Sequence, residues 1–185
     1  MVDALRTTLD AISHVLDVYN VGRIEATSRR VRSDGRTSEW HVSTHTRDRS
    51  WVITDSNGVT ETSIDDKERS RQIATDGTRH TQSSIAPIAV RLCFPLDLPI
   101  WGRMDDDWAI DHADSTNFGY TIALLHTREP GKSAHVEYST EYGLATKFAQ
   151  YQGKTLIAEL ALVDILRPGR RAFSDGSVML ATGSS

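Results

Sequence analysis

A period of two in side-chain character, interrupted by turn dipeptides, runs through most of this chain of 185 residues and constrains its fold more than any other feature. In residues 37–47, Trp40 and Val42 fall on one side of an extended chain, and mostly charged or polar residues fall on the other. Asn57-Gly58 is a strong hairpin signal between two such runs. The pattern predicts a meander of antiparallel strands.

The same alternation returns in a more hydrophobic form after residue 107. Residues 154–166 are apolar on both faces of a strand, and their Leu, Ala and Glu content leaves a helix open as the alternative. The tight turn at Gln152-Gly153 favours a central strand covered on both faces. The strands predicted by the pattern cover residues 37–47, 51–55, 59–65, 69–75, 78–83, 108–112, 118–124, 134–138, 144–151 and 154–166.

Residues 3–20 have the helical period instead, with Asp3 as a possible N-cap and Gly22 as a possible stop. A helix of this length is marginal alone, so its apolar stripe is expected to dock on the sheet. The stripe consists of Leu5, Leu9, Ile12, Leu16 and Tyr19.

Residues 84–107 break both patterns, because Pro87, Pro95 and Pro99 interrupt an apolar stretch. Proline cannot join a sheet ladder and tends to end helices. We therefore predict one or two short helical turns and a long packed loop, which closes with the acidic run 105–107. A loop of this length inside a compact domain is often functional.

Composition indicates one folded domain, with 38% hydrophobic and 25% charged residues. We assign residues 1–168 to a single α+β domain and the Ser- and Gly-rich residues 169–185 to a mostly flexible tail. The single cysteine, Cys93, excludes an intramolecular disulfide. No apolar run suits a secretory signal or a membrane span, so a soluble, cytoplasmic protein is expected. The net charge of −4 gives no reason to expect nucleic acid.

No motif points to a cofactor, a metal or catalysis. The tripeptides 131–133 and 153–155 resemble the end of a phosphate-binding loop but lack its upstream glycine. The aspartates of 105–114 do not have the spacing of a calcium loop. Seven arginines lie between residues 23 and 49. They could meet an anionic partner, but we interpret them as a solvated face that complements the acidic stretch 97–114.

The order of elements is a helix, a polar meander, a proline-broken apolar segment and a more hydrophobic meander. This order resembles the fold of the LolA/LppX/LprG-type lipoprotein carriers over residues 3–166. The resemblance implies a strongly curved antiparallel sheet, an open half-barrel, with helical segments plugging its concave side. Residues 94–103, with Asp106-Asp107-Trp108, are also similar to a segment of uncharacterised actinobacterial proteins, which brings no function with it.

An open half-barrel leaves an apolar concavity that side chains or a ligand must fill. The leading hypothesis is therefore non-enzymatic binding of a lipid or other hydrophobic small molecule, with residues 85–108 as the gate. The alternatives are a protein-interaction module using the sheet face or edge and, last, an enzyme of unrecognised type. The residues expected to line the site are Ile88, Leu92, Phe94, Trp101, Trp108, Phe118, Tyr120 and Ile122.

Overall fold

The computed structural model describes residues 2–16, 22–66, 69–74, 79–81 and 86–167. Its first half comprises α1 (Val2–Leu16), β1 (Arg23–Arg32), β2 (Thr37–His45), β3 (Ser50–Asp55), β4 (Thr60–Asp66), β5 (Arg69–Ala74) and β6 (Arg79–Thr81). Its second half comprises two 3₁₀ helices and five strands, which are η2 (Ile88–Cys93), η3 (Pro95–Asp97), β7 (Trp108–Thr116), β8 (Gly119–His126), β9 (Lys132–Ser139), β10 (Leu144–Gln152) and β11 (Thr155–Leu166).

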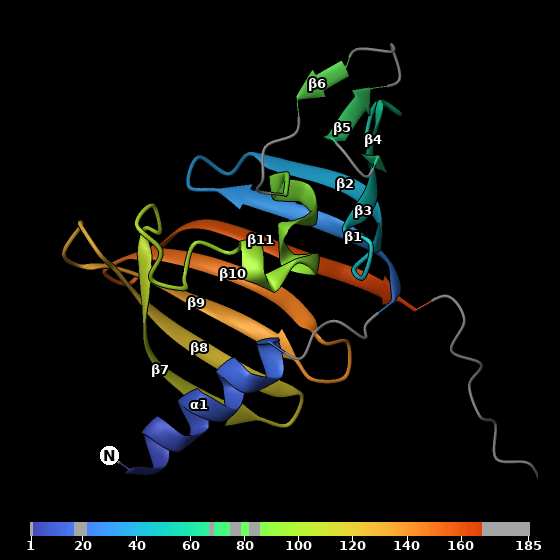
Figure 1. The fold of residues 1–185 in the computed structure, drawn as a ribbon. Coiled ribbons are helices and arrows are strands. Elements are labelled where there is room, and N and C mark those ends of the chain that lie inside the picture. Colours follow the sequence, from blue (N-terminus) through green and yellow to red (C-terminus); the bar gives the residue numbers. More distant parts are fainter. Residues whose placement is uncertain (1, 17–21, 67–68, 75–78, 82–85, 168–185) are drawn as a thin grey trace, which may run out of the picture.

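All the strands belong to one antiparallel sheet in the order β6-β5-β4-β3-β2-β1-β11-β10-β9-β8-β7. Two meanders, β1 to β6 and β7 to β11, are joined where β1 pairs with β11, with Ser28 opposite Leu162 and Arg30 opposite Leu160. The outermost strands, β6 and β7, do not meet, and Figure 1 shows the sheet curving strongly around its concave side. The predicted α+β class with an open half-barrel is confirmed.

The hairpins form where the turn residues predicted them. At the β3–β4 turn, Gly58 adopts a φ of 81°, which a residue with a side chain rarely tolerates. The carboxylate of Asp55 accepts hydrogen bonds from the backbone N–H groups of Asn57 and Val59, at 2.9 Å each. This one carboxylate thereby fixes the reversal between the two strands. The turn between the predicted strands 69–75 and 78–83, at Asp76-Gly77, lies outside the described residues.

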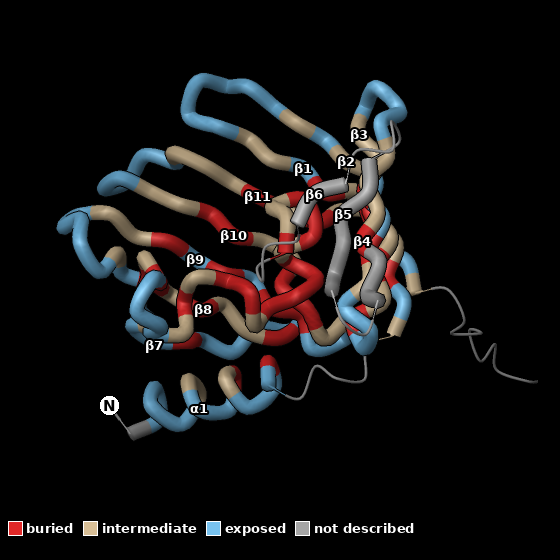
Figure 2. The backbone as a smooth tube through the Cα atoms, turned by 45° about the horizontal axis from the view of Figure 1, so that its top comes forward, coloured by how far each residue is buried: buried red, intermediate tan, exposed pale blue. Residues whose placement is uncertain are grey.

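Strand β11 settles the choice between strand and helix for residues 154–166 in favour of a central strand. The prediction that both of its faces are covered is wrong. Leu160 and Leu162 are buried on the concave side, whereas Ile157 and Val163 on the other side are only half-buried. The buried residues in Figure 2 gather on the concave side because the packing elements lie there.

Helix α1 packs on β7 and β8 but not through the stripe predicted for docking. Leu5, Leu9 and Leu16 remain 63%, 58% and 50% exposed, while Ala11 and Val15 are buried. Small side chains on this face let the helix approach the sheet closely enough for direct polar contacts. The Thr8 hydroxyl accepts a hydrogen bond from Ala113 N–H at 3.0 Å. Of the other two members of the predicted stripe, Ile12 is half-buried and Tyr19 lies outside the described residues.

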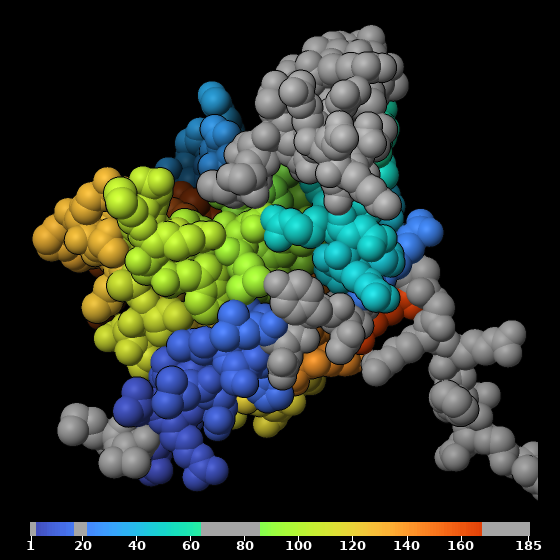
Figure 3. Space-filling model, in the orientation of Figure 1, coloured from blue at the N-terminus to red at the C-terminus, as the bar shows by residue number. Residues whose placement is uncertain are grey.

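Residues 86–107, here called the plug, fill the middle of the concave side, as the ribbon and space-filling views show (Figures 1 and 3). One or two short helical turns were predicted here, and two are present, as η2 and η3. Helix η2 packs against β10, β1 and β2, and its Val90 and Leu92 are completely buried. The main core therefore lies between the plug and the sheet. No helix in the described ranges is long and apolar enough to span a membrane.

Candidate functional site

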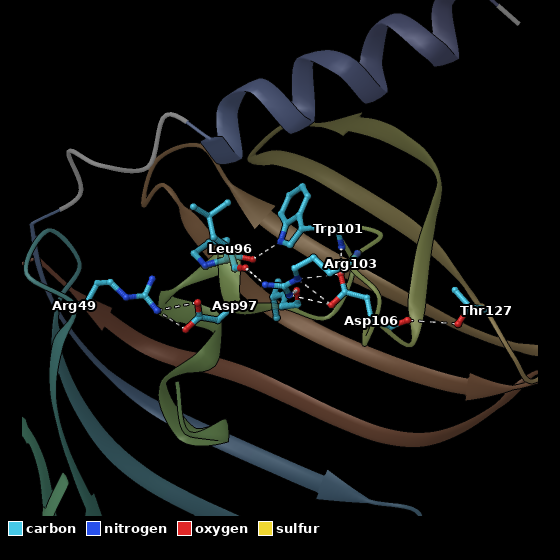
Figure 4. Close-up of polar contacts among 9 residues, drawn as sticks. Arg49, Leu96, Asp97, Trp101, Arg103, Asp106 and Thr127 are labelled. Atoms are coloured by element: carbon cyan, nitrogen blue, oxygen red, sulfur yellow. Dashed lines mark hydrogen bonds and ion pairs between the residues drawn. The ribbon is translucent and has the colours of Figure 1, made fainter. Parts of the chain in front are cut away.

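The first half of the plug is fastened to the sheet by the buried carboxylate of Asp97. The guanidinium of Arg49, at the β2–β3 turn, donates to both carboxylate oxygens at 2.8 and 2.9 Å. The backbone N–H of Ala86 donates to the same group at 3.0 Å. The Arg49–Asp97 pair joins the predicted basic region to the predicted acidic stretch. Figure 4 shows this anchor together with a second one, which is formed by Asp106. One end of η3 is thereby tied to the first meander.

The second half of the plug is organised around the buried carboxylate of Asp106. It accepts hydrogen bonds from the backbone N–H groups of Trp101 and Arg103, at 2.8 and 3.0 Å, and from Arg103 Nε at 3.1 Å. The remaining nitrogens of Arg103 donate to the carbonyl oxygens of Leu96 and Leu98, at 3.1 and 2.6 Å (Figure 4). Every polar atom of this network has a partner, so it has the character of a structural clamp.

A cavity of about 190 Å³ lies beside η2, between the plug and strands β1, β10 and β11. An engineered apolar cavity of roughly 150 Å³ is large enough to bind benzene. We call this space the arginine cavity. The residues that line it are Arg30, Ile88, Arg91, Leu98, Pro99, Asp107, Trp108, Phe148, Gln150, Ala158, Glu159 and Leu160.

The strand pattern explains why an arginine faces the arginine cavity from β1. Ile24 and Ser28 are buried on the concave face, and Arg30 continues the same alternation one step beyond the covered part. Arg30 stands opposite Leu160 of β11, which in turn stands opposite Phe148 of β10. The three side chains form a row across the sheet that runs from a charged end to an apolar floor.

The 3₁₀ geometry of η2 supplies the opposite wall. Side chains three residues apart are eclipsed in a 3₁₀ helix, so Ile88 and Arg91 project from the same side of η2. Both line the arginine cavity. Arg91 Nε donates to the carbonyl oxygen of Ala86 at 3.3 Å. Burial lowers the pKa of the Arg91 guanidinium, nearby Asp97 raises that pKa, and Arg30 lowers it again by repulsion.

The carboxylates and the arginines around the arginine cavity differ in whether they form ion pairs. Its two carboxylates have cationic partners, because Asp107 pairs with Arg128 and Glu159 pairs with Lys147 at 3.4 Å. Glu159 alternates with Leu160 along β11, so its side chain belongs to the opposite face of the sheet. Within the described part of the chain, by contrast, neither Arg30 nor Arg91 forms an ion pair with a carboxylate. The cavity therefore presents two guanidinium groups that have no direct carboxylate partner among the described residues, above an apolar floor.

Two further cavities flank the plug. One of about 220 Å³ lies toward β2 to β4 and is bordered by Trp40, Ile53 and Ile88 among others. Ile88 thus borders both of the larger spaces. A smaller cavity of about 100 Å³ lies beside Phe94 and Cys93. Burial raises the pKa of the Cys93 thiol to about 12, so this sulfur is unsuited to nucleophilic chemistry.

The structure brings seven of the eight predicted lining residues into, or against, one core cluster. Two of them, Ile88 and Trp108, border the arginine cavity. Phe118 stands apart in the β7–β8 turn with 76% of its surface exposed. Whether these side chains meet a ligand stays a prediction. Buried in the cluster are Leu92, Phe94, Trp108 and Ile122, and packed against it are Ile88, Trp101 and Tyr120.

Sequence reasoning missed the two arginines. The sequence pattern places Arg30 among seven basic residues on a solvated face. Arg30 also continues the alternation of Ile24, Ala26 and Ser28, which puts it on the concave face. Arg91 follows Ile88 at the spacing that a 3₁₀ turn brings onto one side. Both signals were present but could be recognised only once the location of the plug was known. No cluster of three or more metal-ligating side chains occurs among the described residues.

Comparisons with known proteins place the chain only coarsely. No family model and no curated protein matches it. Among solved structures, it is similar to an uncharacterized conserved protein from Thermus thermophilus, with 12% identity, a TM-score of 0.48, and 84% of this chain and 86% of that chain covered. It is also similar to MucB in the MucA/MucB complex of Pseudomonas aeruginosa, with 13% identity, a TM-score of 0.41 and 85% of this chain covered.

The chain spans only 56% of that MucB chain. A third similar structure is a putative outer membrane lipoprotein-sorting protein domain from Vibrio parahaemolyticus, with 10% identity, a TM-score of 0.41, and 90% of this chain and 95% of that chain covered. This last match is in keeping with the resemblance to the lipoprotein carriers, while the resemblance to actinobacterial proteins finds no support. Because every TM-score lies below 0.5, these likenesses carry no argument about ligand, partner or activity.

Proposed function

We propose that this protein is a non-enzymatic binding protein that holds a lipid chain or another apolar small molecule in the arginine cavity. One observation carries the proposal. The cavity of about 190 Å³ has an apolar floor formed by Leu98, Trp108, Phe148 and Leu160. Ligand sites are typically concave, mostly apolar and equipped with a few convergent polar groups. The arginine cavity combines such an apolar floor with several charged and polar groups, and the clamped plug holds its walls in place.

The first experiment is native mass spectrometry of the gently purified protein, followed by organic extraction of bound molecules. A stoichiometric apolar adduct is expected, and the extract identifies its class. A clean apo mass, in a protein that also takes up no added fatty acid or phospholipid, would contradict the proposal.

A matched pair of variants locates the binding site. Ala158 lines the arginine cavity, whereas Ala161 lies on the opposite face of the same strand. Ala158→Phe fills the space without burying a charge, so the adduct should disappear while the protein stays folded. Ala161→Phe adds the same side chain outside the cavity and should leave the adduct in place. Retention of the adduct by Ala158→Phe would move the site elsewhere.

A second candidate function, recognition of a partner protein, is favoured by the outer face of α1. Leu5, Leu9 and Leu16 are all at least half exposed there, although helices normally turn such residues inward. Exposed apolar surface of this kind often marks interaction sites. Under this alternative, Leu9→Glu would abolish co-purification of a stoichiometric protein partner, and the bound apolar molecule would be unaffected.

A further inference from the structure

The arginine cavity has a polarity that indicates which class of apolar molecule fits it. At one end, the guanidinium groups of Arg30 and Arg91 face the same space from opposite walls. At the other end, the row across the sheet continues into Leu160 and Phe148. A ligand that satisfies both ends has an anionic head and an apolar chain.

Among the described residues, no direct ion pair with a carboxylate accounts for Arg30 and Arg91. Asp97 is the carboxylate that raises the pKa of Arg91. Both of its oxygens already accept hydrogen bonds from Arg49, and one also accepts from the N–H of Ala86. Asp107 and Glu159 are occupied by Arg128 and Lys147. Arg30 and Arg91 repel each other, Asp97 attracts Arg91, and an anion placed between the two guanidinium groups would relieve their mutual repulsion.

We propose that the ligand is an amphiphilic anion, a carboxylate or phosphate monoester on an alkyl chain, with its head group held between Arg30 and Arg91. This inference rests on the proposed function, because it names the ligand class of the same cavity. Planar guanidinium groups bind carboxylates and phosphates through two parallel hydrogen bonds, so a pair of arginines suits either head group. The alkyl chain lies along Leu98, Trp108, Phe148 and Leu160.

The test is isothermal titration calorimetry with four probes: decanoate, decyl phosphate, 1-decanol and inorganic phosphate. Decanoate or decyl phosphate should bind at least about tenfold more tightly than decanol, because each charge-assisted hydrogen bond contributes enough for about a tenfold change. Inorganic phosphate alone should show no measurable binding, because it cannot use the apolar floor. The better of the two anions identifies the head group.

Variants assign the effect to the two arginines. Arg30→Gln and Arg91→Gln should each weaken binding of the preferred anion about tenfold and leave decanol binding unchanged. Arg29→Gln is the matched control, since Arg29 lies next to Arg30 but on the opposite face, paired with Glu39 at 2.6 Å. It should bind the anion like the wild-type protein. Circular dichroism checks that each variant is folded.

The outcomes separate the two proposals. Equal binding of decanol and the anions, unchanged by Arg30→Gln and Arg91→Gln, would overturn the anionic ligand class and leave the apolar site intact. Inorganic phosphate binding as tightly as decyl phosphate would also overturn it, since the chain would then contribute nothing. If none of the four probes binds, and native mass spectrometry finds no adduct, the proposed function itself fails.

Discussion

Charged groups at the anchors of the plug and at the arginine cavity differ in how they are paired. At the anchors, the carboxylates of Asp97 and Asp106 are surrounded by donors within 3.2 Å. At the cavity, Arg30 and Arg91 converge on open space without a carboxylate partner in the described part of the chain. A closed network serves the fold, because removing any member leaves a buried group unsatisfied. An open pair of charges contributes little to the fold and is therefore available to a ligand.

The comparison predicts its largest effect at Asp106. Asp106→Ala leaves two backbone N–H groups and the Nε of Arg103 without an acceptor, so it should lower the free energy of unfolding by about 3 kcal/mol. Urea denaturation followed by circular dichroism measures the change. Asp105→Ala is the control, because this neighbour is exposed and should change stability by less than about 0.5 kcal/mol. Equal effects at the two positions would mean that the Asp106 network is not a clamp.

The second effect should be smaller, because half of the Arg49 side chain remains in water. Asp97→Ala is expected to cost about 2 kcal/mol and to loosen the attachment of the plug to the first meander. Cys93 reports the loosening, since its buried thiol should react slowly with a maleimide in the wild-type protein and several-fold faster in the variant. An unchanged labelling rate, despite lower stability, would show that the plug does not open at this anchor.

The sequence predicted the architecture because local signals and the fold agree there. Period-two alternation and Asn57-Gly58 were sufficient for β2 to β4, although β1 was not among the predicted strands, and the prolines of residues 87–99 were sufficient for a plug built of short turns. Strand β11 was recognisable from the tight turn that precedes it. These features depend on neighbours along the chain, which is the information that a single sequence contains.

The anchors and the cavity could not be predicted because they depend on contacts distant in sequence. Asp105, Asp106 and Asp107 are identical in type, yet only Asp106 is buried. The docking face of α1 was assigned to its leucines, although close approach to the sheet selected Ala11 and Val15 instead. A hydrophobic pattern identifies the helix face with the most apolar residues. The face that docks is the one whose side chains fit closely against the sheet.

The third prediction concerns pH. Burial alone would raise the pKa of Asp106, but the hydrogen bonds from Arg103 and Trp101 outweigh it and leave the pKa below its ordinary value. A carboxyl group with a lowered pKa in the folded state stabilises the protein above its unfolded pKa, and this contribution is lost as pH falls through the folded value. The stability gap between wild type and Asp106→Asn should therefore narrow below about pH 4. Denaturant midpoints measured from pH 3 to pH 7 check the trend, and a gap that widens in acid would contradict it.

The smallest effect on stability is expected at the arginine cavity. This prediction is the most direct test of the difference between the anchors and the cavity. Arg30→Gln removes a charge that has no carboxylate partner in the described ranges and that repels Arg91, so the free energy of unfolding should change by less than about 0.5 kcal/mol. Urea denaturation of the ligand-free protein measures this change. With the preferred anion added at saturation, the wild-type protein should gain more stability than Arg30→Gln, because only tight binding to the native state raises the unfolding free energy. A loss of about 2 kcal/mol or more in the ligand-free variant, on the order of a buried anchor, would instead make Arg30 part of the framework and remove the contrast on which the ligand proposal depends.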